Sequence, residues 1–175
     1  MPAVPEGCRV FDGRNGDING RYAVVVSRFN DRITGGLLDG ALSTLMEKGI
    51  PADSIDIYWV PGAFELPTVA GELVRRADHV AVLCLGAVIR GETTHDQHIN
   101  RAVSREIARL GAESGIPVLF GVLTCNTLEQ AIARSVPVKG TAGKDRPDAR
   151  IGNKGAECAE AAVEMVGLLR SIRNK

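Results

Sequence analysis

Five segments of the chain carry side chains whose types and spacing suit ligand binding or proton transfer. The densest is Gly91-Glu-Thr-Thr-His95, where a histidine follows a short polar turn. Thr94 and Gln97 have the spacing of a capping box, which predicts that Thr94 precedes a helix whose first residue is His95. The N–H groups of such a turn suit a phosphate, and the helix dipole there favours a neutral, proton-accepting imidazole. A surface or capping histidine is the alternative.

The other four segments offer one candidate side chain each. Phe29 follows a short apolar run, and its ring either lies on a planar ligand or folds back onto the core. Glu65 follows a Pro-Gly turn, where its carboxylate either meets a helix dipole or accepts hydrogen bonds from sugar-like hydroxyls. Arg134 is either a solvated cation or a guanidinium that pairs with phosphate. Lys154 lies in a Gly-Asn-Lys-Gly turn and could face an anionic ligand.

The elements that must position these residues alternate along the chain between apolar, β-branched runs and helical patterns. This order predicts an α/β fold: a three-layer sandwich with a four-stranded parallel sheet and helices on both faces. In such sheets ligands bind beyond the carboxyl ends of the strands, where the Phe29, Glu65, His95 and Arg134 segments fall. We expect strands over residues 21–27, 55–60, 79–88 and 117–124, and helices over 33–48, 64–76, 94–114, 128–135 and 154–170.

Composition and charge narrow the classes of protein to which the chain can belong. With 175 residues, 45% of them apolar and 24% charged, the chain can bury one core without disulfide support. Twenty-one basic residues balance 21 acidic ones, and this zero net charge argues against a general nucleic-acid binder or a membrane-surface protein. No apolar run approaches the roughly 18 residues of a membrane-spanning helix.

The N-terminal residues and the cysteines indicate a domain organisation and a compartment. We expect residues 1–20 to form an irregular arm and residues 21–175 to form one α/β domain. The arm lacks the basic and apolar regions of a secretory signal, so we expect a cytoplasmic protein without membrane partners. Four scattered cysteines predict reduced, mostly buried thiols.

His95 and His98 are the candidate metal ligands of the chain. The sequence places no third ligand beside them, which predicts no metal site.

Six motifs, each after an expected strand or at the start of the last helix, resemble those of lumazine synthases over about residues 21–170. This resemblance implies a flavodoxin-like fold and a cofactor-independent condensation, the penultimate step of riboflavin biosynthesis. The substrates would be 5-amino-6-(D-ribitylamino)uracil and 3,4-dihydroxy-2-butanone 4-phosphate, and the products 6,7-dimethyl-8-ribityllumazine, phosphate and water. The motifs are Arg-Phe-Asn (28–30), Val-Pro-Gly-Ala-Phe-Glu-Leu-Pro (60–67), Ala-Val-Ile-Arg-Gly-Glu-Thr-Thr-His (87–95), Phe-Gly-Val-Leu-Thr (120–124), Glu-Gln-Ala-Ile-Ala-Arg (129–134) and Gly-Asn-Lys-Gly (152–155).

The resemblance also implies a role for individual residues of this chain. His95 would shuttle protons, Phe29 would stack on the pyrimidine, and Arg134 would pair with the phosphate of the butanone substrate. Lys154 would lie near the phosphate or the ribityl chain. Further implied contacts are Ala63, Phe64 and Glu65 with the ribityl side, backbone groups of Ala87, Val88 and Ile89 with the uracil edge, N–H groups of Glu92 and Thr93 with the phosphate, and Phe120 closing the pocket, often across a subunit boundary.

The resemblance implies a homo-oligomer built on pentamers, and one departure bears on its size. Residues 139–151 lengthen a turn that is short in family members forming sixty-subunit shells, where this turn lies between pentamers. The added bulk, and charges that would have to lose their water, favour a pentamer-based assembly without a full shell. The N-terminal arm keeps larger assemblies open, since such arms can add a strand to a neighbour's sheet.

Three other functions share parts of this pattern. A flavodoxin-like module that carries FMN without catalysis would need a phosphate loop rich in Ser, Thr and Gly after the first strand, and none is present. An archaeal-type riboflavin synthase, distantly similar, would convert lumazine alone. A scaffold protein with an inactive site is disfavoured because Phe29, Glu65, His95 and Arg134 are all retained.

Overall fold

Two parallel strands, β1 (Tyr22–Ser27) and β3 (Ala81–Ile89), run side by side through the middle of the sheet. All of β1, and all of β3 except its last residue, is buried, as expected for strands that helices cover on both faces. The edge strands β2 (Ile55–Val60) and β4 (Val118–Cys125) complete the order β2-β1-β3-β4, with every pairing parallel. The computed structural model describes residues 4–136 and 152–174.

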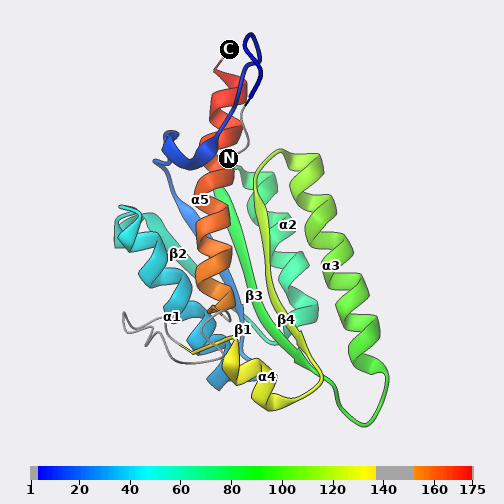
Figure 1. The fold of residues 1–175 in the computed structure, drawn as a ribbon. Helices are drawn as coiled ribbons and strands as arrows, with labels where there is room; N and C mark the ends of the chain where they lie inside the picture. The colour runs from blue at the N-terminus through cyan, green and yellow to red at the C-terminus, as the bar shows by residue number, and fades with distance from the viewer. Residues whose placement is uncertain (1–3, 137–151, 175) are drawn as a thin grey trace.

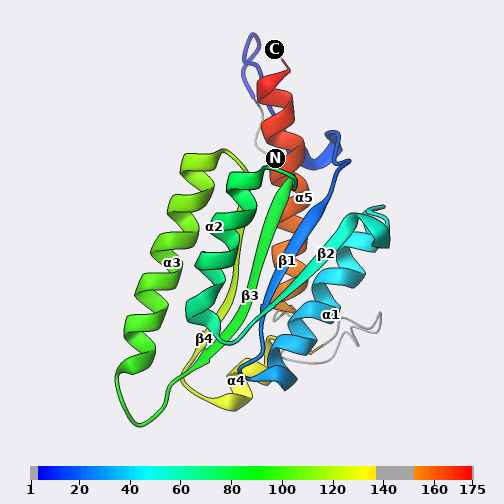
Figure 2. The same cartoon turned by 180° about the vertical axis from the view of Figure 1, so that it is seen from behind.

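Helices lie on both faces of this sheet (Figures 1 and 2). On one face α1 (Asp31–Glu47), α4 (Leu128–Ala133) and α5 (Lys154–Arg173) cover one apolar core. On the other face α2 (Leu66–Arg76) and α3 (His95–Ser114) cover a second core. Alternate residues of β1 point into the two cores, which explains why its sequence is apolar throughout. Within the described ranges no helix is both long enough and apolar enough to cross a membrane.

The structure confirms the predicted three-layer α/β fold with a four-stranded parallel sheet. The element boundaries differ by a few residues. The expected helix over 64–76 divides into a short 3-10 turn, η3 (Ala63–Glu65), and α2, whose second residue is Pro67. Proline is tolerated in a first helical turn because the N–H groups there have no helical partner. The expected lengthened turn over residues 139–151 lies outside the described residues.

The described part of the N-terminal arm lies against the chain's own last helix (Figure 1). Two glycines let the arm approach this helix closely. A Cβ at Gly13 would lie 1.9 Å from the carbonyl oxygen of Glu164, and one at Gly16 would lie 2.6 Å from Cα of Gly167. Arg170 adds an ion pair to Asp17, with Nη1 2.6 Å from Oδ2. These contacts hold the residues just before β1 on α5 of the same chain.

A buried histidine joins the amino-terminal ends of three strands, away from the ligand edge of the sheet. His79 is only 6% exposed, and its Nε2 lies 2.8 Å from Oδ2 of Asp56. The Nε of Arg21 donates to the same oxygen at 3.1 Å. Hydrogen bonds from Arg21, and then from His79, hold the pKa of Asp56 below its ordinary value. The carboxylate of Asp56 therefore stabilises the fold while it is ionised.

Replacing this carboxylate should make the stability of the protein depend on pH in a defined direction. We expect Asp56→Asn to lower the free energy of unfolding at pH 7 by about 1–3 kcal/mol, since a charge-assisted contact to a buried imidazole is lost. A carboxyl whose pKa is lowered in the folded state stabilises above its ordinary pKa and loses that effect as pH falls through its folded-state value. The difference between the two proteins should therefore shrink below about pH 4.

Urea denaturation from pH 3 to 8 measures this difference directly. Asp78→Asn is the matched control, because Asp78 pairs with Arg76 where both side chains are more than half exposed. Such a surface pair contributes little to stability, so this variant should resemble the wild type at every pH. A constant deficit for Asp56→Asn across the range, or none at pH 7, would contradict the role given to the Asp56 carboxylate.

Candidate active site

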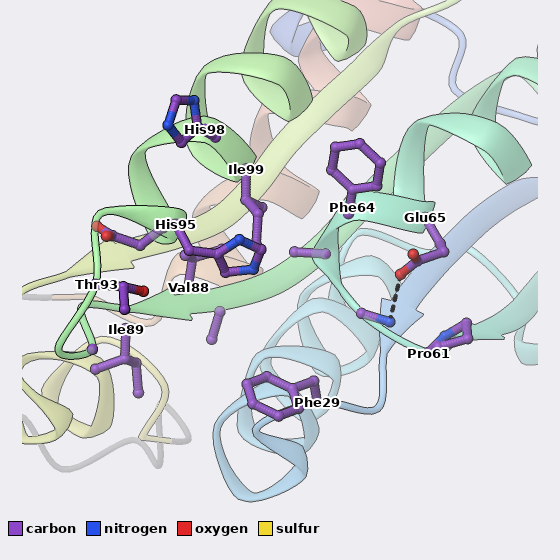
Figure 3. Close-up of a pocket in the computed structure, with 15 residues that line it drawn as sticks. Phe29, Pro61, Phe64, Glu65, Val88, Ile89, Thr93, His95, His98 and Ile99 are labelled. Carbon is purple, nitrogen blue, oxygen red and sulfur yellow. Dashed lines mark hydrogen bonds between the residues drawn. The ribbon is translucent and has the colours of Figure 1, made fainter.

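The carboxyl ends of β1, β2 and β3 border a cavity of about 690 Å³, closed on its other side by the start of α3 (Figure 3). This volume lies within the usual range for small-molecule sites. The cavity is lined by nine of the thirteen predicted site residues: Phe29, Ala63, Phe64, Glu65, Ala87, Val88, Ile89, Thr93 and His95. The other four, Glu92, Phe120, Arg134 and Lys154, are not among the lining residues.

Phe29 lies in the loop that joins β1 to α1, and its ring borders the cavity (Figure 3). The backbone of this loop continues the pairing with β2: the N–H of Arg28 donates to Val60 at 2.8 Å and that of Phe29 to Pro61 at 3.0 Å. The side chain of Phe29 is 70% exposed, which excludes the alternative that it folds back onto the core. A ring held on a fixed backbone and left bare presents a flat apolar face to a ligand.

Asn30 fixes this loop and was not singled out as a functional residue from the sequence. Its backbone adopts a left-handed conformation, with φ of 62°, immediately before α1. Its side-chain Nδ2 donates to the carbonyl oxygen of Ala87 at 3.0 Å, which ties the end of β1 to the end of β3. The carbonyl of Ala87 keeps a second lone pair for a ligand. An asparagine directly before a helix, after a buried strand, is the sequence signal for such a residue.

Glu65 has a structural role that neither of its two predicted alternatives describes. Its Oε2 accepts a hydrogen bond from the backbone N–H of Gly62 at 2.9 Å, drawn as the dashed line in Figure 3. This bond closes the turn between β2 and α2 and sets the direction of the half-buried carboxylate. The residue therefore shapes the wall of the cavity while its carboxylate remains at the surface of that wall.

His95 is the first residue of α3, as predicted, and its imidazole extends into the cavity (Figure 3). The expected capping box is wrong in one respect, because the Thr94 hydroxyl accepts no hydrogen bond from the helix. Instead the N–H of Gln97 donates to the backbone oxygen of Thr94 at 3.1 Å. His98 also borders the cavity, one turn further along α3. In the described ranges no group of three or more His, Cys, Asp or Glu side chains could hold a metal ion.

Glu92 and Phe120 lie outside the cavity for different reasons. Glu92 is exposed in the turn between Gly91 and Thr93, both of which line the cavity, so its backbone is adjacent to the site. Phe120 lies within the edge strand β4 and pairs with Cys84, three residues before the β4 residue that pairs with Ala87. At about 3.3 Å per strand residue, that separation is roughly 10 Å along the strand. The ring of Phe120 therefore does not reach the cavity of its own chain.

Arg134 and Lys154 lie together beyond the end of β4. The two residues are joined by their backbones, since the N–H of Lys154 donates to the carbonyl oxygen of Arg134 at 2.8 Å. The Nη2 of Arg134 donates to Oε2 of Glu157 at 2.8 Å, so Arg134 is paired with a carboxylate rather than solvated alone. Glu157 was missed from the sequence, although its spacing of three residues from Lys154 on a helix was the available signal.

One comparison with known proteins bears on this arrangement. A family model described as 6,7-dimethyl-8-ribityllumazine synthase matches residues 19–170. The matched range contains every strand of the sheet, the cavity and the Arg134–Lys154–Glu157 cluster.

The contact between Asn30 and Ala87 can be tested by a pair of substitutions. We expect Asn30→Ala to destabilise the protein by about 1–3 kcal/mol, because alanine loses the hydrogen bond and is strained at positive φ. Asn30→Gly loses the same bond but tolerates the backbone, so it should cost only about 1 kcal/mol. Urea denaturation of the two variants separates the contributions. Two variants as stable as the wild type would show that this loop needs neither feature.

Proposed function

The chain belongs to the 6,7-dimethyl-8-ribityllumazine synthase family, and from this premise we propose how its residues divide the work of the reaction. The protein is a transferase of riboflavin biosynthesis that joins 5-amino-6-(D-ribitylamino)uracil to 3,4-dihydroxy-2-butanone 4-phosphate. The products are 6,7-dimethyl-8-ribityllumazine, phosphate and water. The family match over residues 19–170 is the observation that carries this assignment, and the residue roles below are our proposal.

The pyrimidine substrate binds in the cavity between Phe29 and the end of β3. Its flat ring stacks on the exposed ring of Phe29, and backbone groups of Ala87, Val88 and Ile89 recognise its polar edge. The ribityl chain runs toward the turn before α2, where it meets Ala63, Phe64 and Glu65. The mostly apolar lining supports this placement, because a few fixed polar groups on apolar walls orient a ligand while excluding water.

The phosphate of the butanone substrate binds beside the turn before α3. The N–H groups of Glu92 and Thr93 and the guanidinium of Arg134 are its partners, and Lys154 contributes charge nearby. The Thr94 hydroxyl does not cap α3 and, in the first turn, only the N–H of Gln97 is taken by the backbone oxygen of Thr94, so the N–H groups of the first two helical residues are left for an anion. The pairing of Cys125 with Ile89 brings the β4–α4 end of the sheet next to the cavity lining.

His95 is the proposed general acid and base. Imine formation, loss of phosphate and ring closure each require a proton transfer, and the position of His95 in the cavity lining supports this role. The attacking amine is already a nucleophile, so no activated serine or cysteine is needed. Holding the two substrates together in one cavity contributes the remaining rate acceleration, since well-oriented reactants reach effective molarities of about 10⁵–10⁸ M.

A second copy of the chain completes the site. Phe29 and Phe64 are 70% and 58% exposed, an unusual amount of bare aromatic surface at a cavity mouth. Phe120 does not reach the cavity of its own chain, and its side chain is partly exposed on an edge strand. We assign Phe120 to the cavity of a neighbouring copy, in a cytoplasmic homo-oligomer built on pentamers without a full shell.

The activity is tested by mixing the two substrates with purified protein and following lumazine absorbance and phosphate release. We expect His95→Gln to fold normally and to lower kcat by about 10²-fold, the lower end of the usual contribution from general acid–base catalysis. His98→Gln removes the other imidazole, one turn along α3, and should stay much closer to the wild type. Unchanged kinetics in His95→Gln would remove His95 from the mechanism.

The assembly is tested by light scattering on the full chain. We expect a mass of about 93 kDa, five times the 18.6 kDa of one chain, or twice that for paired pentamers. A Phe120→Ala variant should retain the assembly but bind the pyrimidine substrate more weakly, because one wall of each site is lost. A megadalton particle would contradict the absence of a shell, and a monomer would contradict the shared site.

A further inference from the structure

One carboxylate beside the proposed phosphate site has no role in the assignments above. Glu157 lies in the first turn of α5, and a single oxygen of its side chain, Oε2, faces two cations. Nη2 of Arg134 lies 2.8 Å from that oxygen, and Nζ of Lys154 lies 3.4 Å from it. The side chains of all three residues are between 28% and 40% exposed. The cluster is therefore neither sealed in the core nor fully solvated.

The backbones that carry these three side chains are fixed relative to one another. Besides the bond from Lys154 N–H to the Arg134 carbonyl, the buried Asn153 holds this junction together. Its Oδ1 accepts from the N–H groups of Gly155 and Ala156, which caps α5. Its Nδ2 donates to the carbonyl oxygens of Gly36 at 2.8 Å and Val136 at 3.1 Å. Because these hydrogen bonds fix the backbone, the direction of the Arg134 guanidinium depends on its side-chain contacts.

Within the described residues, Glu157 is the side chain that orients the guanidinium of Arg134. The only side-chain hydrogen bond of Arg134 described there goes to Glu157, through one of its three nitrogen atoms. The remaining N–H groups of a guanidinium fork are left for another acceptor. The charge of Arg134 also reaches the Cys125 thiol: burial raises the pKa of that thiol, and Arg134 opposes the rise. Arg134 is thus held close to the end of β4, whose last residue pairs with a cavity residue.

The charge of Glu157 suits this task. Burial acts to raise the pKa of its carboxyl, but the hydrogen bond and charge of Arg134, followed by those of Lys154, outweigh burial and lower the pKa overall. Glu157 is therefore ionised at neutral pH, and its negative charge offsets the repulsion between two neighbouring cations. The longer contact, to Lys154, is the weaker of the two, which leaves Lys154 the freer cation to turn toward an incoming phosphate.

We propose that Glu157 is a positioning residue that aims Arg134 at the phosphate of the substrate and keeps Lys154 beside it. The inference rests on the proposed function, in which Arg134 binds that phosphate. Glu157 itself touches neither substrate. A carboxylate alone would repel a phosphate, so its benefit lies in orienting the guanidinium before the phosphate arrives.

The test compares steady-state kinetics of Glu157→Ala, Glu157→Gln, Arg134→Ala and the double variant Arg134→Ala/Glu157→Ala. KM and kcat are measured for each substrate with the other saturating, and thermal unfolding is recorded for every variant. Glu160→Ala is the matched control, since it removes an exposed carboxylate one turn further along α5. This control should leave both kinetic constants unchanged.

We expect Glu157→Ala to raise KM for the butanone phosphate by about three- to tenfold, as for loss of one partly exposed charge-assisted contact. KM for the pyrimidine and kcat should stay near the wild type. Glu157→Gln keeps an acceptor oxygen for Arg134 and should raise the phosphate KM less. In the Arg134→Ala background, where KM is already raised, Glu157→Ala should add little because the residue that it positions is gone.

Other outcomes overturn the proposal in distinguishable ways. A lower phosphate KM in both Glu157 variants would show that the carboxylate only repels the substrate. A lower melting temperature with unchanged KM would make Glu157 structural, and equal effects with and without Arg134 would show that it does not act through that residue. A raised KM in Arg134→Ala beside a normal KM in Glu157→Ala overturns only this inference. A normal KM in Arg134→Ala overturns it together with the proposed role of Arg134.

Discussion

The parallel pairing of the two central strands, β1 and β3, which are buried apart from the last residue of β3, is the constraint on which the rest of the structure depends. Parallel strands that are covered on both faces end at the same edge of the sheet, so each connection into the next helix begins there. This geometry brings together residues that lie far apart in the sequence. Phe29, Glu65 and His95 follow three different strands and nevertheless border one cavity.

Much of the fold could be predicted because its local and global signals agree. The apolar run before Ser27 is continuous, not alternating, and the structure buries it on both faces. Strand order could not be read in the same way, because periodicity describes the faces of a strand but not its neighbours. The arrangement β2-β1-β3-β4 depends on how the crossover helices pack, which is set by contacts between distant residues.

The site residues that come directly after strands could be predicted from the sequence. Contacts between residues that lie far apart in the sequence could not. The hydrogen bond from Asn30 to Ala87 joins residues 57 positions apart, and that from Arg134 to Glu157 joins residues 23 apart. Neither distance corresponds to a helical or strand period, so no local pattern reveals the pair. Thr94 shows the opposite case: its spacing to Gln97 is that of a capping box, yet its hydroxyl is not used in the cap.

The two ends of the sheet differ in how they use charge. At the amino-terminal end Asp56 binds a buried histidine and an arginine. At the carboxyl end Glu157 shares one oxygen between two partly exposed cations. The first arrangement stabilises the fold, whereas the second leaves hydrogen-bonding capacity for a ligand. The proposed phosphate site therefore combines fixed backbones with side chains that still have donors to offer.

The central claim is that one crevice at the carboxyl edge of the sheet receives both substrates. A crystal structure of the protein with 6,7-dimethyl-8-ribityllumazine and inorganic phosphate tests it most directly. The account predicts that the ring of the product stacks on Phe29, and that the phosphate lies within hydrogen-bonding distance of the Glu92–Thr93 backbone and of Arg134. A ring bound away from Phe29, or a phosphate that contacts neither of those groups, would contradict it.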